Sequence, residues 1–499
     1  MPRKGLSALS GWESRERRWV RHAVDAAIVG CFLMTGGCAA DRPSPEPMRP
    51  DVEVSQPTSP EKLPLAGAHI GPMYRELLPI DLSNVVQVAM AQNVDIRQAR
   101  ERVVAAQGQY ESSIEGIVPS LSPSIGVTHL KGVNTSVVGV LTPANFSILT
   151  VAALVKFALN PGQAYYDVVA AKKRLLGTDQ QERSVLLNTL QTATIQYYDL
   201  VLAQVRVAVA RDAVTEAEEL LRLTSLRVKT GTGILADDDR ARAALAARQQ
   251  ELTLAIEAFY EGGLGLAVTL NLDPTVTLIP KPDEVETIQL VRDDLGIDER
   301  LDLAVAWRPD LQSVRHFADA AGAAASSVVW AGVGPQLQAG YQNGALRSQT
   351  PDNISGKPEQ QIASASAGFS LSLSILGRIK TADSVKRQAV LEAERTLIAV
   401  RAEVVRTSQR SSTQARLIPL AKQEVDAATE ALRLARENLK AGNALVDDVL
   451  LAEDALNTAR QHYTAAVVSY DQAQVNLLAA LGILDKTRLL ARDSGGVPP

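Results

Sequence analysis

The sequence predicts a mixed α/β membrane protein built from two copies of one unit, each with long helices and two membrane strands. Three observations predict this fold class: a short turn sequence that occurs twice, apolar residues at heptad spacing around each turn, and an alternating apolar–polar segment. Of the 499 residues, 46% are hydrophobic and only 4% aromatic. That composition favours helices that pack through small side chains.

The repeated turn reads KTGTGILADD in the first half and KAGNALVDD in the second, 211 positions later. Gly231 in the first copy and Gly442 in the second are each followed, six residues on, by an aspartate, Asp237 or Asp448. Other short segments recur in the same order at separations of 215 or 216 residues. We therefore expect an internal duplication that covers most of the chain.

Long helices are expected on both sides of each turn. After the second turn, apolar or small residues follow one another in steps of four and three from Leu445 to Ala480. Such a heptad pattern is typical of a coiled-coil-like helix. The pattern is rougher after the first turn, where Asp238 and Arg248 interrupt it. Within the second half, Pro419 predicts a kink or a break in the helix before the turn.

Each turn therefore joins two antiparallel helices, in hairpins at 162–270 and 378–482. The turn glycines can adopt the left-handed conformation that ends a helix, and the residue after each glycine can cap the next helix. The turn residues are Gly231, Thr232, Gly442 and Asn443.

Between the helices, each half carries two segments with a period of two. In QIASASAGFSLSLSIL, residues 361–376, apolar side chains alternate with serines. This alternation is typical of a membrane strand with lipid on one side and water on the other. Four strands are expected, near 119–130, 146–159, 335–342 and 361–376. Since even small barrels take eight strands, several chains must share one barrel. A soluble hairpin packed on helices is the alternative.

The N-terminus predicts a targeting segment of the lipoprotein type. A basic leader precedes an apolar run, from Ala23 to Cys38, that is too short to cross a bilayer as a helix. The run ends in TGGC, which resembles a bacterial lipoprotein signal in which Cys38 becomes the lipidated first residue. An ordinary signal peptide cleaved nearby is the alternative. The Pro-rich segment after Cys38 should form an extended tether.

Composition and motifs argue against nucleic-acid binding and catalysis. The net charge is −5 and no basic face is evident, so nucleic acid is not an expected partner. The chain has no nucleophile elbow, phosphate-binding loop or dinucleotide fingerprint, and no Cys/His spacing suits a metal. We expect no enzyme, no cofactor and no metal site.

Over about residues 75–484 the chain resembles the TolC-type outer-membrane efflux proteins. The resemblance rests on the duplicated helix–strand–strand–helix layout, the two turns, and the final segment YDQAQVNLLAALGIL. It implies a homotrimer with a twelve-stranded β-barrel, four strands per chain, on a periplasmic α-helical barrel. It also implies a passive duct that docks a periplasmic adaptor (a membrane fusion protein) and an inner-membrane pump to expel small molecules. An N-terminal lipid such as palmitate would anchor Cys38 in the outer membrane of a Gram-negative bacterium.

The resemblance places the two turns at the periplasmic tips, where their residues would serve adaptor docking. On a helical wheel that starts at Leu445, Asp448 lies about 60° from the apolar seam and Asp447 nearly opposite it. Asp237 holds the place of Asp448 in the first half. Asp237 and Asp448 are therefore the candidates for the aperture, and Asp447 for an outer, adaptor-facing or solvated position.

Two other functions fit parts of the pattern. A duct for type I protein secretion would have the same architecture, and a soluble periplasmic coiled-coil scaffold would keep the helices without a pore. The expected organisation, in chain order, is a signal peptide (1–37), a tether (38–74), a first repeat (75–283), a linker (284–299), a second repeat (300–484) and a C-terminal tail (485–499).

The first prediction concerns the N-terminus. We expect intact-mass measurement of the purified mature protein to show an N-terminal Cys38 that carries acyl chains. An unmodified N-terminus at another residue would contradict this expectation. A Cys38→Ser form that still assembles would show that the lipid is not needed for folding.

Overall fold

A computed structural model describes residues 76–135, 139, 141–281, 290–291, 295–350, 353–355, 359–369, 374–441 and 443–485. The expected signal peptide, most of the tether, Cys38, the turn residue Gly442 and the C-terminal tail after 485 lie outside these residues.

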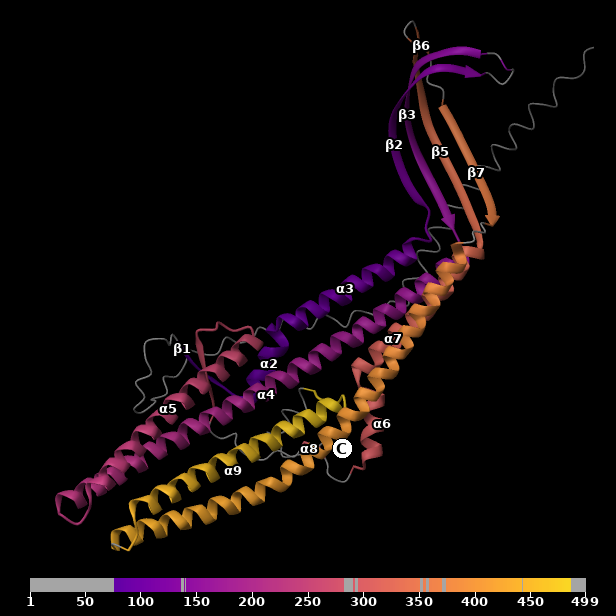
Figure 1. The fold of residues 1–499 in the computed structure, drawn as a ribbon. Coiled ribbons are helices and arrows are strands. Elements are labelled where there is room, and N and C mark those ends of the chain that lie inside the picture. Colours follow the sequence, from indigo (N-terminus) through magenta and orange to yellow (C-terminus); the bar gives the residue numbers. More distant parts are fainter. Residues whose placement is uncertain are drawn as a thin grey trace, which may run out of the picture. The chain divides into compact units, whose positions relative to one another are not determined.

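The described residues form eight helices and seven strands (Figure 1). The helices are α2 (Leu82–Gln92), α3 (Val94–Glu115), α4 (Pro161–Lys229), α5 (Leu235–Thr269), α6 (Ile297–Trp307), α7 (Pro309–Val333), α8 (Ser374–Ala441) and α9 (Val446–Ala480). The strands are β1 (Glu76–Ile80), β2 (Ser120–Thr135), β3 (Leu141–Leu159), β4 (Val276–Pro280), β5 (Pro335–Thr350), β6 (Asn353–Ser355) and β7 (Glu359–Phe369).

Two helical hairpins, α4–α5 and α8–α9, make up most of the helical part (Figure 1). With 69 residues, α4 is about 100 Å long at a rise of ~1.5 Å per residue. The 68-residue α8 is continuous through Pro419, so the break that this proline predicts is absent. Among the described helices, none has the length and apolar character needed to cross a membrane.

The heptad residues of α9 are mostly buried within the chain. Val449, Leu456 and Ala459 pack with residues of α8 in one apolar cluster. Leu445, which begins the predicted seam, is 65% exposed because it precedes the helix, and Val446 is buried in its place. The first turn of the seam was therefore misplaced by one residue.

The long strands form one antiparallel sheet, in the order β2–β3–β5–β7, with β6 beside the end of β5. The pairing has no bulge along these ladders, so directly opposed residues lie on the same face. In β2, β3, β5 and β7 the odd-numbered residues share one face and the even-numbered residues the other. We call these the odd face and the even face of the sheet.

The strands are longer than predicted at four of their ends and shorter at two. β2 and β3 extend into residues 131–145 between the predicted strands, β5 continues to Thr350, β7 begins two residues early at Glu359, and β2 begins one residue late at Ser120. In contrast, the predicted strand 361–376 ends at Phe369, and Ser374 already begins α8. A side-chain contact explains the change: Ile375 is buried against α7, where a Cβ on Gly332 would lie 2.1 Å from Ile375 Cδ1. This helix–helix packing overrides the local period of two.

The second prediction tests the packing of α9. Ala459 is fully buried in the α8–α9 cluster, so Ala459→Phe should overpack it and lower the free energy of unfolding by about 1–3 kcal/mol. Ala455, on the same helix, is exposed, so Ala455→Phe is the matched control. Thermal unfolding in detergent measures both variants. Equal unfolding temperatures for the two would contradict the packing of Ala459.

Candidate functional site at the hairpin tips

The first tip ends α4 with a glycine in the left-handed conformation, as predicted. Gly231 has φ of +76°, and its N–H donates to Val228 O at 3.1 Å. The Thr232 N–H donates to Arg227 O at 2.9 Å. The carbonyls of Arg227 and Val228, near the end of α4, therefore both accept a hydrogen bond from the turn. At the second tip, the Asn443 N–H donates to Asn438 O at 2.9 Å, which is the same five-residue span.

The next helices begin later than predicted. α5 starts after Ile234 and α9 after Leu445, so Thr232 and Asn443 do not occupy the N-cap positions. The Thr232 hydroxyl instead donates to Arg227 O at 3.3 Å. The capping prediction was wrong because the chain needs several residues to reverse before a second helix can start.

The two candidate aperture aspartates have different partners. Asp448 is exposed and its carboxylate accepts a hydrogen bond from the Leu445 N–H at 2.9 Å, which satisfies one free donor at the start of α9. Asp237 is half-buried and lies 3.5 Å from Arg240 on its own helix. The structure of one chain does not bring Asp237 and Asp448 together through any contact among the described residues.

Arg240 joins the two tips. Its Nη1 lies 3.5 Å from both Asp237 Oδ1 and Asp447 Oδ2. Asp447, expected in an outer position, therefore faces the other hairpin. A second contact between the tips is the hydrogen bond from Arg227 Nη1 to Leu439 O at 3.3 Å. Arg240 and Arg227 thus connect the hairpins at this end through charged and polar groups.

A cluster of four charged residues lies further along the hairpins. Arg436 Nη2 is 2.9 Å from Glu453 Oε1 and 3.3 Å from Glu216 Oε2, and Arg460 Nη1 is 3.6 Å from Glu216 Oε1. Glu453 is only 4% exposed. The cluster therefore links α4 of the first hairpin to α8 and α9 of the second. We call these residues the inter-hairpin cluster.

Burial dominates the titration of Glu453. Loss of hydration raises the pKa of its carboxyl above the usual value, although Arg436 acts in the opposite direction. Raised in the folded state, this pKa makes the folded chain bind a proton more tightly than the unfolded chain does. Stability from this group therefore increases as the pH falls through the raised pKa.

Sequence reasoning did not identify the inter-hairpin cluster or the buried Asp238. Asp238 accepts a hydrogen bond from the Ser225 hydroxyl and pairs with Arg242 at 2.6 Å. Arg242 therefore balances the charge of this buried carboxylate in the α4–α5 hairpin. Arg248, which also interrupts the heptad pattern, pairs with Asp454 of the other hairpin. The interruptions of the heptad pattern at Asp238 and Arg248 could have indicated these ion pairs, because a charged residue in an apolar seam requires a partner.

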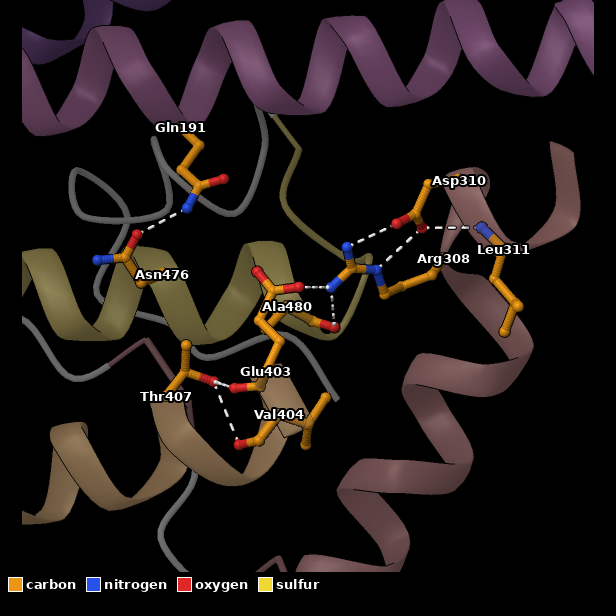
Figure 2. Close-up of polar contacts among 9 residues, drawn as sticks. All are labelled: Gln191, Arg308, Asp310, Leu311, Glu403, Val404, Thr407, Asn476 and Ala480. Carbon is orange, nitrogen blue, oxygen red and sulfur yellow. Dashed lines mark hydrogen bonds and ion pairs between the residues drawn. The ribbon is translucent and has the colours of Figure 1, made fainter. Parts of the chain in front are cut away.

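At the other end of the hairpins, a polar network around Arg308 holds three helices together (Figure 2). Arg308 donates to Asp310 at 2.7 and 2.9 Å, to Glu403 of α8, and to Ala480 O of α9 at 3.4 Å. Burial alone would lower the pKa of Arg308, but hydrogen bonds and attraction from Asp310 and Glu403 keep it above the usual value. The guanidinium therefore stays charged and fixes the end of α9.

Part of the second half of the chain matches a known protein family. Residues 301–483 match the model of the family described as outer membrane efflux protein. No curated protein matches the chain. The resemblance to TolC-type outer-membrane efflux proteins is thereby confirmed, and proteins of this family are channels rather than enzymes.

Solved channel structures share the fold. The outer-membrane channel OprN is 18% identical with a TM-score of 0.69, over 80% of this chain and 89% of that one. The outer membrane protein VceC of Vibrio cholerae is 19% identical with a TM-score of 0.70, over 80% and 96%. The CmeC outer membrane channel of Campylobacter jejuni is 16% identical with a TM-score of 0.69, over 83% and 89%.

The third prediction concerns the inter-hairpin cluster. Arg436→Gln removes the cation beside the buried Glu453 and should lower the free energy of unfolding by about 1–3 kcal/mol at neutral pH. The difference in free energy of unfolding between the wild type and Arg436→Gln should decrease as the pH falls, because a protonated Glu453 carries no charge for the cation to balance. Denaturant unfolding at several pH values measures this difference.

Arg433→Gln is the matched control, since Arg433 is on the same helix and pairs only with the exposed Glu430 and Glu437. Exposed pairs contribute about 0–1 kcal/mol. A deficit for Arg436→Gln that equals that of Arg433→Gln, or that does not change with pH, would show that Glu453 does not depend on Arg436.

Proposed function

We propose that the chain forms the outer-membrane channel of a tripartite export system, because residues 301–483 match the family described as outer membrane efflux protein. The channel is a passive duct through which an inner-membrane pump and a periplasmic adaptor expel small molecules. One observation carries the proposal: a sheet with an exposed apolar face and two open edges is joined to two long helical hairpins.

The odd face of the sheet supports a location in the outer membrane. On β2, Leu121, Ile125 and Val127 are 68%, 75% and 73% exposed, so they are largely uncovered in the part of the chain that the structure describes. The apolar part of the odd face on β3 runs from Leu149 to Leu159. These residues span about 34 Å along the strand, which at a tilt of ~40° covers roughly 26 Å of bilayer. This matches the apolar band of outer-membrane barrels.

The open edges support a homotrimer. β2 lies at one edge of the sheet and β7 at the other. Among the described strands, β2 is hydrogen-bonded only to β3, and β7 only to β5. Four long strands cannot close a barrel, whereas three copies supply twelve and pair β2 of one copy with β7 of the next. The internal duplication then provides six hairpins around one axis.

The tips are proposed to form the periplasmic mouth. Gly231, Thr232, Gly442 and Asn443 would meet the adaptor, and Asp237 and Asp448 would line the closed aperture. The exposed Asp448 carboxylate accepts a hydrogen bond from the Leu445 N–H through one of its two oxygens. An acyl chain on Cys38 would anchor the mature N-terminus in the same outer membrane.

The two alternatives separate on different grounds. A duct for type I protein secretion would have the same architecture and would differ only in its pump and cargo. A soluble periplasmic scaffold would leave the apolar odd face in water, and exposed apolar patches of this kind mark interaction or membrane surfaces. The odd face therefore favours a channel.

Fractionation and conductance test the proposed function. The mature protein should appear in outer-membrane fractions as an oligomer that dissociates on heating, and it should give discrete conductance steps in planar bilayers. A monomer in the soluble periplasmic fraction, without conductance, would support the scaffold instead.

The fourth prediction concerns the aperture. Asp448→Ala should reduce the preference of the channel for cations over anions, because three exposed carboxylates crowded round one axis attract cations. Asp447→Ala, the matched neighbour, should reduce it less because Asp447 is paired with Arg240. Reversal potentials under a KCl gradient measure both. A larger effect of Asp447→Ala would reverse the assignment of the two aspartates.

A further inference from the structure

The even face of the sheet carries one charged residue. The even-numbered residues of β2, β3, β5 and β7 are serine, threonine, glutamine, asparagine, glycine, alanine and a few larger apolar residues, with the single exception of Lys156. Lys131 of β2 has an odd number and lies on the opposite face. Lys156 is therefore the sole source of full charge on this face of the described strands.

The neighbours of Lys156 across the sheet are small and polar. Its register row reads Ser120, Lys156, Gly340 and Ser364, from β2 through to β7. Gly340 has no side chain, and Ser364 Oγ would lie 3.1 Å from a Cβ placed there, so the serine hydroxyl lies over the glycine in the row of the lysine. The lysine side chain is exposed, and no acid among the described residues lies within ion-pair distance of it. Its ammonium group is free to bind a ligand.

Hydrogen-bond donors surround this position. The diagonal neighbours on the even face are Ser122 on β2 and Gln338 and Gln342 on β5. Diagonal neighbours are about 7–8 Å apart, within reach of long side chains. An ammonium group with hydroxyl and amide donors around it suits a carboxylate, sulfonate or phosphate group. A cation would find no carboxylate there.

Lys156 lies at the helix end of the sheet. It stands three residues before the end of β3 at Leu159, and α4 begins at Pro161. If the odd face meets lipid, the even face lines the water-filled interior, and each copy of the chain places its lysine at the same level. The candidate aperture aspartates lie at the opposite end of α4 and α8 from this lysine.

We propose that Lys156 is a specificity-determining residue of the duct, and that three copies form a cationic ring which binds anionic groups of the cargo where the barrel meets the helices. The inference rests on the proposed function, because it requires the trimer and an inward-facing even face. In a water-filled barrel the ring acts over about one Debye length, ~8 Å at physiological ionic strength. Its effect on selectivity should therefore weaken as salt increases.

Planar-bilayer recording of the full-length protein tests the proposal. Under a KCl gradient, Lys156→Gln should shift the reversal potential toward cation selectivity, and Lys156→Glu should shift it further. Both shifts should be larger at low KCl than at 1 M KCl. Lys156→Arg keeps the charge and should behave as the wild type.

Lys131→Gln is the matched control, since it removes one lysine from the same sheet but on the odd face, and it should leave the reversal potential unchanged. If wild-type channels form and Lys156→Gln shifts selectivity no more than Lys131→Gln does, the ring is absent while the proposed channel stands. If the wild-type protein forms no channel at all, both the proposed function and the ring are overturned. Lys156→Gln is neutral and similar in length, so its result decides even where Lys156→Glu does not insert.

Discussion

The structure depends on how each hairpin is fastened where its second helix ends. The last carbonyls of an α-helix lack partners within the helix and must find donors elsewhere. At the end of α5, Asn93 Nδ2 donates to Thr269 O at 2.8 Å, and at the end of α9, Arg308 Nη1 donates to Ala480 O at 3.4 Å. Both donors lie at a corner between two short helices, α2–α3 or α6–α7. Each corner thus fixes the end of the hairpin that is opposite to its tip. The helix between tip and corner has 35 residues in both hairpins.

Much of this architecture could be predicted from the sequence because it follows from local periodicity. A period of two places alternate residues on opposite faces, so the apolar residues of the strand predicted near 146–159 are expected on one face before the strand partners are known. Heptad spacing similarly predicted the burial of Val449, Leu456 and Ala459. The left-handed Gly231 was predictable because a helix that turns back sharply requires such a residue.

Features that depend on contacts distant in the chain could not be predicted in this way. Ile375 reads as the end of a strand, and only its contact with Gly332 shows why it begins a helix. Glu453 reads as a solvated helix residue, yet Arg436 and the packing of α4 make it one of the most buried acids in the described part of the chain. The partner of Asp447 likewise belongs to the other hairpin, 207 residues away. A helical wheel contains no information about such neighbours.

The two ends of the hairpins are held together by different kinds of interaction. Near the corners, one apolar cluster includes residues of α2, α4, α5, α8 and α9. Near the tips, the second cluster has eight buried residues, of which seven belong to α8 and α9 and only Leu220 to the first hairpin. There the hairpins meet through Arg240, Arg248 and Arg436. Apolar burial contributes about 25 cal/mol per Å² whatever the orientation, whereas a partly exposed ion pair contributes about 0–1 kcal/mol and depends on salt and pH. The corners are therefore the firm end of the hairpin pair, and the tips are the end at which charge, acid and salt determine how closely the two hairpins associate.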